Sequence, residues 1–332
     1  MLLSPNSNEV SERMLVLDEA ETKNALPFPA LINALDAMFR SGVEAPTRHH
    51  HEMAVPGEAD ATLLLMPAWL PGRYFGVKMV SVFPGNTTRG LPSIYGSYLL
   101  SSGVTGELLA VLDGGELTAR RTASASALAS RALSRADSSI LLIVGTGRLA
   151  VNLIEAHAAV RPIAKILVWG RDRAKAEPIA QRALSLGLEA EIVTDLKQAV
   201  TSADIISCAT LSETPLIQGA WLKPGTHLDL IGAFKPTMRE SDDEAVRRAT
   251  IFVDTRAGAL SEAGDIIQPI RAGVISADDI AADLTDLAGG MHKGRQSADE
   301  ITLFKSVGAS LEDLAGAILA LEQVTHKASE EL

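Results

Sequence analysis

A glycine-rich turn in the middle of the chain constrains the fold most strongly. Residues 145–150 read Gly-Thr-Gly-Arg-Leu-Ala, directly after the apolar run 138–144 and before a helical pattern. In such a G-x-G-x-x-A turn the first glycine, Gly145, permits a tight bend, and Gly147 lets the backbone approach a pyrophosphate. The small Ala150 lets helix and strand pack closely, and the helix N-terminus favours the negative phosphates. The pattern therefore predicts a dinucleotide site at the end of a strand.

The pattern around this turn alternates between strands and helices. Expected strands cover residues 140–144, 165–169, 191–194, 204–210, 227–232 and 251–254, and expected helices cover 148–160, 173–186 and 242–248. This alternation predicts an α/β fold, a Rossmann-type doubly wound parallel sheet of six strands. The first ~118 residues instead mix a helix at 28–39 with short strand-like runs at 62–66, 74–82 and 107–112, which is typical of an α+β domain.

Two further helices complete the expected organisation, one over residues 117–136 between the domains and one over 301–323. The predicted division is residues 1–118 with 301–332 as one domain and residues 119–300 as the Rossmann domain. At 332 residues the chain is long enough for two domains that each bury a core.

Composition excludes several classes of protein. The formal net charge of -11 argues against a nucleic-acid partner, which would require a basic face. The apolar runs have the length of strands, far below the roughly 20 residues of a membrane span. The N-terminus lacks the basic start and apolar stretch of a secretory signal, so a cytoplasmic location is expected. The single cysteine, Cys208, follows an apolar strand pattern and is expected to be buried and structural.

The end of the second expected strand bears on the choice of nucleotide. Gly170 stands where an NAD-binding protein usually places an acidic residue on the ribose 2′-hydroxyl. Arg171 and Arg173 follow, and guanidinium groups pair well with a 2′-phosphate. This pattern favours NADPH over NADH. The alternative is that both arginines belong to a solvated helix start that Asp172 caps.

Two polar features interrupt the first half of the chain. Arg48 precedes three consecutive histidines, residues 49–51, but neighbouring strand residues point to opposite faces, so the histidines cannot converge on one ion and no metal site is predicted. Lys78 lies in an otherwise apolar run, where an unpaired ammonium would be costly. It is expected to have an anionic partner unless the strand lies at an edge with the lysine in water.

Several motifs together resemble the ornithine cyclodeaminase/mu-crystallin family. They are Arg48, the Val77-Lys78 pair, the Gly-Leu-Pro-Ser turn at 90–93, the Leu-Thr-x-x-Arg-Thr-Ala helix start at 117–123, the glycine turn, and Phe-Lys-Ser-Val-Gly at 304–308 followed by Leu-Glu-Asp at 311–313. The resemblance spans residues 48–315. It implies a substrate-binding domain that also forms a homodimer, completed by the C-terminal helix, with the Rossmann domain between.

The resemblance also implies roles for individual residues. Arg48 and Lys78 match the catalytic and substrate-carboxylate positions, with Val307 and Gly308 beside the substrate. The expected cofactor contacts are Ser93, Arg121, Gly145, Thr146, Gly147, Arg148, Leu149, Arg171, Arg173, Thr210, Gly232 and Ser306.

One departure from the family pattern separates two chemistries. The cyclodeaminase branch carries an acid/base aspartate in the segment 231–236, where this chain has Phe234, and a glutamate where it has Leu64. A phenyl ring cannot exchange a proton, so the lyase reaction loses its principal group. The resemblance then implies a ketimine reductase that reduces Δ1-pyrroline-2-carboxylate or Δ1-piperideine-2-carboxylate with NADPH. Alanine dehydrogenase, ornithine cyclodeaminase and a non-catalytic NADPH-dependent binding protein remain alternatives.

Overall fold

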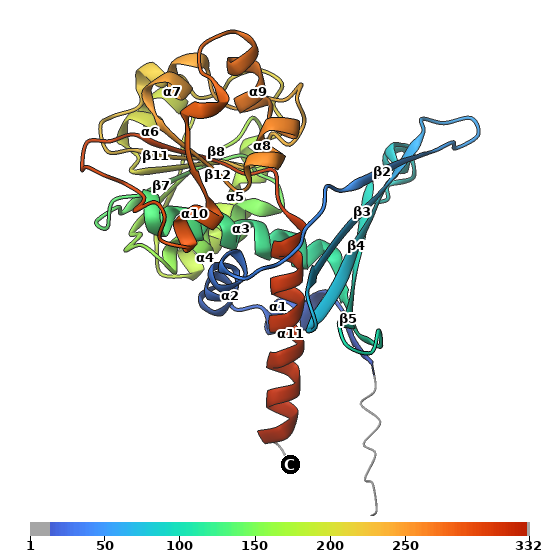
Figure 1. The fold of residues 1–332 in the computed structure, drawn as a ribbon. Helices are drawn as coiled ribbons and strands as arrows, with labels where there is room; N and C mark the ends of the chain where they lie inside the picture. Colours follow the sequence, from blue (N-terminus) through green and yellow to red (C-terminus); the bar gives the residue numbers. More distant parts are fainter. Residues whose placement is uncertain (1–13, 331–332) are drawn as a thin grey trace, which may run out of the picture.

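The computed structural model describes residues 14–330, with side chains as far as residue 326, and contains two β-sheets joined by helices (Figure 1). The first sheet has six strands in the order β1-β6-β5-β4-β3-β2. These strands are β1 (Leu15–Leu17), β2 (His49–Met53), β3 (Ala61–Leu70), β4 (Tyr74–Val82), β5 (Ile94–Ser102) and β6 (Leu108–Asp113). The pairs from β2 to β6 are antiparallel, and β1 joins β6 in parallel.

Helices cover only one face of this sheet. The helix α11 (Ser310–Glu330) packs against β3, β4 and β5, and α3 (Gly114–Leu133) packs against β5. The covered face includes the buried side chains of Met66, Lys78 and Tyr98, which are neighbours across β3, β4 and β5. On the opposite face Phe75 and Met79 are exposed. The sheet therefore has one packed and one open side (Figure 1).

The second sheet is entirely parallel and has eight strands in the order β13-β12-β14-β11-β10-β7-β8-β9. They are β7 (Ile140–Val144), β8 (Lys165–Trp169), β9 (Glu189–Ile192), β10 (Ile205–Cys208), β11 (His227–Leu230), β12 (Thr250–Val253), β13 (Ile280–Asp283) and β14 (Thr302–Lys305). Their near-continuous burial is typical of a parallel sheet with helices on both faces. The Rossmann prediction is confirmed, although the expected strand number of six was two short.

The prediction of a helix over residues 301–323 was wrong at its start. Residues 302–305 form β14, which lies between β11 and β12 in the middle of the parallel sheet, on the other side of the domain boundary expected at residue 301. The helix begins only at Ser310, after Gly308 has turned the chain with φ +82°. The apolar residues at 311–318 have helical spacing. The buried run at 302–305 has only four residues, which is too short for its periodicity to distinguish a strand from a helix.

Two more expectations needed correction. The helix expected at 117–136 runs from Gly114 to Leu133, because the Asp113 side chain accepts from the Glu116 amide and begins the helix earlier. The strand β5 was not predicted. Turn-forming residues directly precede it in the sequence and obscured its strand pattern, whereas in the structure it pairs with β4 and β6.

The remaining helices connect these sheets. They are α1 (Glu19–Ala25), α2 (Phe28–Arg40), α4 (Leu149–Ala158), α5 (Arg173–Ser185), α6 (Leu196–Ser202), α7 (Asp243–Arg248), α8 (Arg256–Glu262), α9 (Gly264–Arg271) and α10 (Leu284–Ala288), with 3₁₀ turns η1 (Pro84–Arg89), η2 (Gly219–Trp221) and η3 (Ala277–Asp279). Serine- and alanine-rich α3 packs against α2, α4 and α11 and contacts strands of both sheets, β5 in the first and β11 in the second, so it ties the two sheets together. Among residues 14–330, no helix combines the length and apolarity that crossing a membrane requires.

Candidate active site

The glycine turn lies where the order of the parallel strands reverses. The strand β7 has β8 on one side and β10 on the other, so the chain leaves β7 at the switch point where α/β sheets bind ligands. Gly145 has φ +119°, and a Cβ atom there would lie 2.7 Å from the carbonyl oxygen of Ala209. At Gly147 a Cβ atom would meet nothing within 4 Å. The turn is thus closely packed at Gly145 and open at Gly147. This arrangement leaves space for a pyrophosphate at the start of α4.

Gly170 has a steric role that the sequence did not reveal. A Cβ atom at this position would collide with the side-chain methyl of Thr146 in the glycine turn. A larger residue here would force the Thr146 side chain to move, so packing as well as charge favours glycine at this position. Arg171 and Arg173 are exposed, and Asp172 caps α5 by accepting from the Ala174 amide at 3.0 Å. The solvated helix start and a phosphate-binding pair are compatible descriptions of the same segment.

Lys78 lies at the centre of the covered face of the first sheet. Its Nζ donates to Oδ1 of Asp313 at 2.8 Å and to Oγ1 of Thr118 at 3.2 Å. The strand β4 lies between β3 and β5, so the expectation of an anionic partner for a buried lysine is confirmed and the edge-strand alternative is excluded. Burial lowers the pKa of Lys78 to about 8, although the carboxylate of Asp313 opposes this shift.

Arg121 shares the carboxylate that binds Lys78. Its Nε lies 3.0 Å from Oδ1 of Asp313 and its Nη1 lies 2.7 Å from Oε2 of Glu312. Both acidic residues are fully buried at the start of α11, and burial raises the pKa of Glu312 to about 7. In the sequence, Glu312 and Asp313 stood out only as part of a motif. Two acidic residues opening an otherwise apolar helix were the signal that could have identified them as partners of buried cations.

Arg48 reaches the same region from the segment before β2. Its Nη2 donates to the carbonyl oxygens of Val307 at 3.2 Å and Gly308 at 2.8 Å, and its Nε lies 3.2 Å from Oε1 of Glu262. None of the hydrogen bonds described for residues 14–326 uses Nη1 of Arg48. The charge of Arg48 is also near enough to lower the pKa of Lys78. Gly308, to which Arg48 donates, packs against Arg121, and Arg121 shares Asp313 with Lys78, so the fold connects Arg48 to the surroundings of Lys78.

Asp254 fixes the loop against which Arg48 lies. Its Oδ2 accepts from Oγ of Ser306 at 3.0 Å and from the amides of Val307 at 2.8 Å and Gly308 at 2.7 Å. A Cβ atom at Gly308 would collide with the guanidinium of Arg121. Hence Ser306, Val307 and Gly308 form a rigid wall between Arg48 and Arg121. Asp254, which follows the buried strand β12 at the carboxyl edge of the sheet, was not predicted as a site residue.

The other residues expected at the site lie on several separate segments. Thr210 follows β10 and Gly232 follows β11, and Phe234, two residues after Gly232 in the same loop, is 38% exposed. Ser93 is half-buried between η1 and β5, where its carbonyl accepts from the Phe83 amide at 2.8 Å. The guanidinium of Arg148 pairs with Glu19 at 2.9 Å and with Glu116 at 3.0 Å. This side chain is thus engaged between the two halves of the chain, while Leu149 begins α4.

The histidine run and the cysteine fall outside this site. The three histidines lie on β2 with exposed side chains, and residues 14–330 contain no group of three histidine, cysteine or acidic side chains arranged to hold a metal. Cys208 is buried, as predicted, and burial raises the pKa of its thiol well above the ordinary value.

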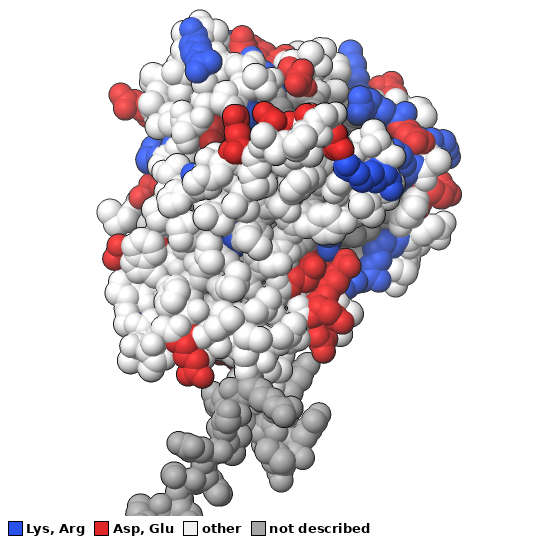
Figure 2. All heavy atoms as spheres, turned by 90° about the vertical axis from the view of Figure 1, so that its right-hand side faces the viewer, with Lys and Arg blue, Asp and Glu red and all other residues white. Residues whose placement is uncertain are grey.

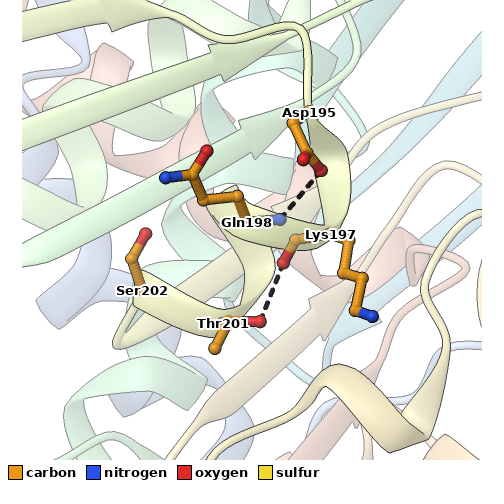
Figure 3. A pocket seen from close by; sticks show the side chains of 5 residues that line it. All are labelled: Asp195, Lys197, Gln198, Thr201 and Ser202. Carbon is orange, nitrogen blue, oxygen red and sulfur yellow. Dashed lines mark hydrogen bonds between the residues drawn. The ribbon is translucent and has the colours of Figure 1, made fainter.

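An open hollow lies at α6, away from the glycine turn (Figure 3). It continues to Ile140 and Lys165, the first residues of β7 and β8, whereas the glycine turn follows the last residue of β7. Asp195 accepts from the Gln198 amide and Thr201 donates to the Lys197 carbonyl, so these polar groups serve their own helix. Nothing in the hollow converges on a ligand.

The fold and the site together define a Rossmann-fold protein whose basic, buried pocket adjoins a dinucleotide-type glycine turn. The chain belongs to the Ornithine cyclodeaminase/mu-crystallin family, whose model matches residues 12–328. This agrees with the resemblance expected from the motifs.

Three known proteins illustrate the relationship. A Δ1-pyrroline-2-carboxylate reductase of Paracoccus denitrificans is 42% identical over 259 residues, covering 78% of this chain and 82% of that protein. Ketimine reductase mu-crystallin of Mus musculus is 33% identical, covering 90% and 92%. The structure of Thermococcus litoralis Δ1-pyrroline-2-carboxylate reductase, solved with NADH and L-proline, has a TM-score of 0.88 at 36% identity and covers 95% and 98%.

Proposed function

We propose that this chain is a nicotinamide-nucleotide-dependent reductase of cyclic imino acids, converting Δ1-pyrroline-2-carboxylate to proline and Δ1-piperideine-2-carboxylate to pipecolate. The observation that carries the proposal is the buried Lys78, held by Asp313 and close to Arg48, beside a loop with Phe234 where a lyase would need a carboxylate. The names of the relatives support the same reaction class.

The residues proposed to hold the nucleotide surround the switch point of the parallel sheet. The glycine turn and the start of α4 would bind the pyrophosphate, with Arg171 and Arg173 toward the adenosine ribose and Thr210, Gly232 and Ser306 toward the nicotinamide. Ser93 and Arg121 would contribute from the first half of the chain. When bound, the nucleotide supplies the hydride, and the protein supplies orientation.

Arg48 and Lys78 would act on the substrate. The guanidinium of Arg48 is oriented by Glu262 and by two backbone carbonyls, and its Nη1 can donate to a carboxylate. Lys78 would place positive charge near the imine and give a proton to its nitrogen as the carbon accepts the hydride. A pKa of about 8 makes this ammonium a better proton donor than an ordinary lysine. Val307 and Gly308 would form the wall beside the ring.

The choice of NADPH is proposed on charge. Two exposed arginines follow a glycine, which adds no repelling carboxylate near a 2′-phosphate. The Thermococcus litoralis relative was solved with NADH. The nucleotide preference of this chain therefore needs a direct comparison of both.

A homodimer is proposed from the open face of the first sheet. Val16, Phe75, Met79 and Tyr95 are between 41% and 63% exposed there. Figure 2 views the molecule from this side and shows a broad area with few charged side chains. A large exposed apolar patch of this kind marks an interface. In this proposal residues 1–118, with the C-terminal helix, provide both dimerisation and substrate binding.

The test is steady-state kinetics of the purified chain with both cyclic imines, each with NADPH and NADH. The comparison substrates are pyruvate with ammonia for an alanine dehydrogenase, and ornithine for a cyclodeaminase. We expect the cyclic imines with NADPH to give the highest kcat/KM. Faster ammonia release from ornithine, or no turnover of any imine despite nucleotide binding, would contradict the proposal and favour a lyase or a binding protein.

A further inference from the structure

A fully buried carboxylate, Glu240, lies beneath two loops that end adjacent strands of the parallel sheet. Its Oε1 accepts from the amide of Thr210 and from the Thr210 hydroxyl, each at 2.7 Å. Its Oε2 accepts from the amides of Gly232 at 2.8 Å and Ala233 at 3.2 Å. Glu240 therefore connects the loop after β10 with the loop after β11 through four hydrogen bonds.

One of the loops that Glu240 joins, at 209–210, is in direct contact with the glycine turn, and the other packs against that loop. A Cβ atom at Gly232 would collide with the backbone of Thr210, and one at Gly145 would lie 2.7 Å from the carbonyl oxygen of Ala209. Three strand ends are thus packed backbone to backbone. A shift of the loop at 209–210 should therefore displace the turn at Gly145, because the backbones approach each other closely at both contacts.

Two further buried side chains hold Glu240 in place. Oδ1 of Asp265 accepts from the amides of Glu240 at 2.9 Å and Ser241 at 3.0 Å, and Nζ of Lys305 lies 3.1 Å from Oδ2 of Asp265 and 4.0 Å from Oε2 of Glu240. All three charged groups are fully buried. Two carboxylates and one ammonium leave a net charge of -1 when all are ionised. That charge is stabilised by the loop amides that Glu240 accepts from.

We propose that Glu240 is a positioning residue that holds the loops at 209–212 and 231–234 in the geometry required for nucleotide binding, with Lys305 and Asp265 as its support. The inference rests on the proposed function, because it assumes that these loops face the nucleotide. The Glu240 carboxylate is fully buried, and it accepts from the amide and hydroxyl of Thr210 in one loop and from the amides of Gly232 and Ala233 in the other. Its four acceptor contacts to loop groups are suited to fixing backbone geometry.

The central variant is Glu240→Gln, which keeps the shape but replaces one acceptor oxygen with a donor. The N–H groups of one loop then face the NH₂ of the glutamine, which cannot accept a hydrogen bond. Because a buried donor without a partner is costly, that loop should shift, and nucleotide binding should weaken by about tenfold or more. Binding is measured without substrate, from the fluorescence of NADPH or NADH. Hydrogen exchange of peptides covering residues 209–212 and 231–234 should become faster in the same variant.

A matched control is Asp229→Asn, which alters another fully buried carboxylate whose partners are Ser126 and Ser207 rather than the loops. It should lower Tm but change nucleotide affinity by less than about twofold. The double variant Lys305→Met with Asp265→Asn keeps the net charge of -1 and leaves Glu240 its loop contacts. It removes the ion pair that supports Glu240 but not the four loop contacts, so it should weaken nucleotide binding less than Glu240→Gln does.

The outcomes separate the inference from the proposed function. If the wild-type chain binds neither nucleotide, the proposed function fails. If Glu240→Gln binds nucleotide like wild type, or Asp229→Asn weakens binding equally, the positioning role is wrong. Should Glu240→Gln fail to fold, Glu240→Asp retains the charge but is one methylene too short to reach both loops. An affinity equal to that of wild type in this folded variant would also overturn the inference.

Discussion

Nζ of Lys78 lies 2.8 Å from Oδ1 of Asp313, although 235 positions separate the two residues in the sequence. One comes from the middle strand of the first sheet and the other from the start of the last helix. The contact puts a cation and an anion together where neither could remain charged alone. It also raises the pKa of Lys78, against the larger lowering that burial causes.

The Lys78–Asp313 pair leads to a prediction about pH. If the Lys78 ammonium delivers the proton, kcat should fall as pH rises through about 8. Asp313 raises the pKa of Lys78, so Asp313→Asn should lower it and move this alkaline limb to lower pH. The pH profile of kcat measures the shift. Asp36→Asn, which alters a partner of Arg40 on α2, is the control and should leave the profile unchanged.

Arg48 and Lys78 should be energetically coupled. Arg48→Met keeps bulk but removes the group that holds the carboxylate, so it should mainly raise the substrate KM. Lys78→Met should mainly lower kcat, by about 10²- to 10⁴-fold for a general acid. The double variant should lose less than the product of the two effects, because a misplaced substrate cannot exploit the remaining group. Strict additivity in a full kinetic cycle would show that the two side chains act independently.

The two arginines after β8 should discriminate between nucleotides. Arg171→Ala with Arg173→Ala should raise the KM for NADPH at least about tenfold, since a charge-assisted phosphate contact is worth about 1.5 to 3 kcal/mol. The KM for NADH should change much less. Parallel titrations with both nucleotides measure the difference. Equal effects on both nucleotides would mean that the two arginines are only solvent-exposed residues at the start of α5.

Phe234 should mark the difference between reductase and lyase. Phe234→Asp places a carboxylate in the loop after β11 and should impair imine reduction without creating cyclodeaminase activity, because the second carboxylate position is Leu64. Imine reduction and ammonia release from ornithine are measured side by side. Substantial ammonia release by the wild-type chain would show that Phe234 does not prevent the lyase reaction.

The open sheet face should control assembly. Phe75→Glu with Met79→Glu places two charges on the exposed side of β4, where burial against a second copy would leave them unpaired. We expect light scattering after gel filtration to give a dimer for wild type and a monomer for the variant. Met291→Glu, at another highly exposed apolar residue beyond α10, is the control and should remain dimeric. A monomeric wild-type chain would contradict the assembly proposal.

Local features determined the parallel sheet, the glycine turn and the need for an anion near Lys78. Each depends on neighbours within a few residues: a buried strand followed by a tight turn, or one charge in an apolar run. Strand β14 was misread as helix because four buried residues carry no usable period. Its place between β11 and β12 depends on distant strands.

Tertiary structure decided which side chains meet. Asp313 for Lys78, Glu262 for Arg48, Asp254 for the loop at 306–308 and Glu240 for the strand-end loops all come from distant segments. A buried charge demands a partner of opposite sign or a set of hydrogen bonds, and that demand is visible in sequence. Several buried acidic residues could meet it, and only the packing of α11 and the parallel strands determines which one does.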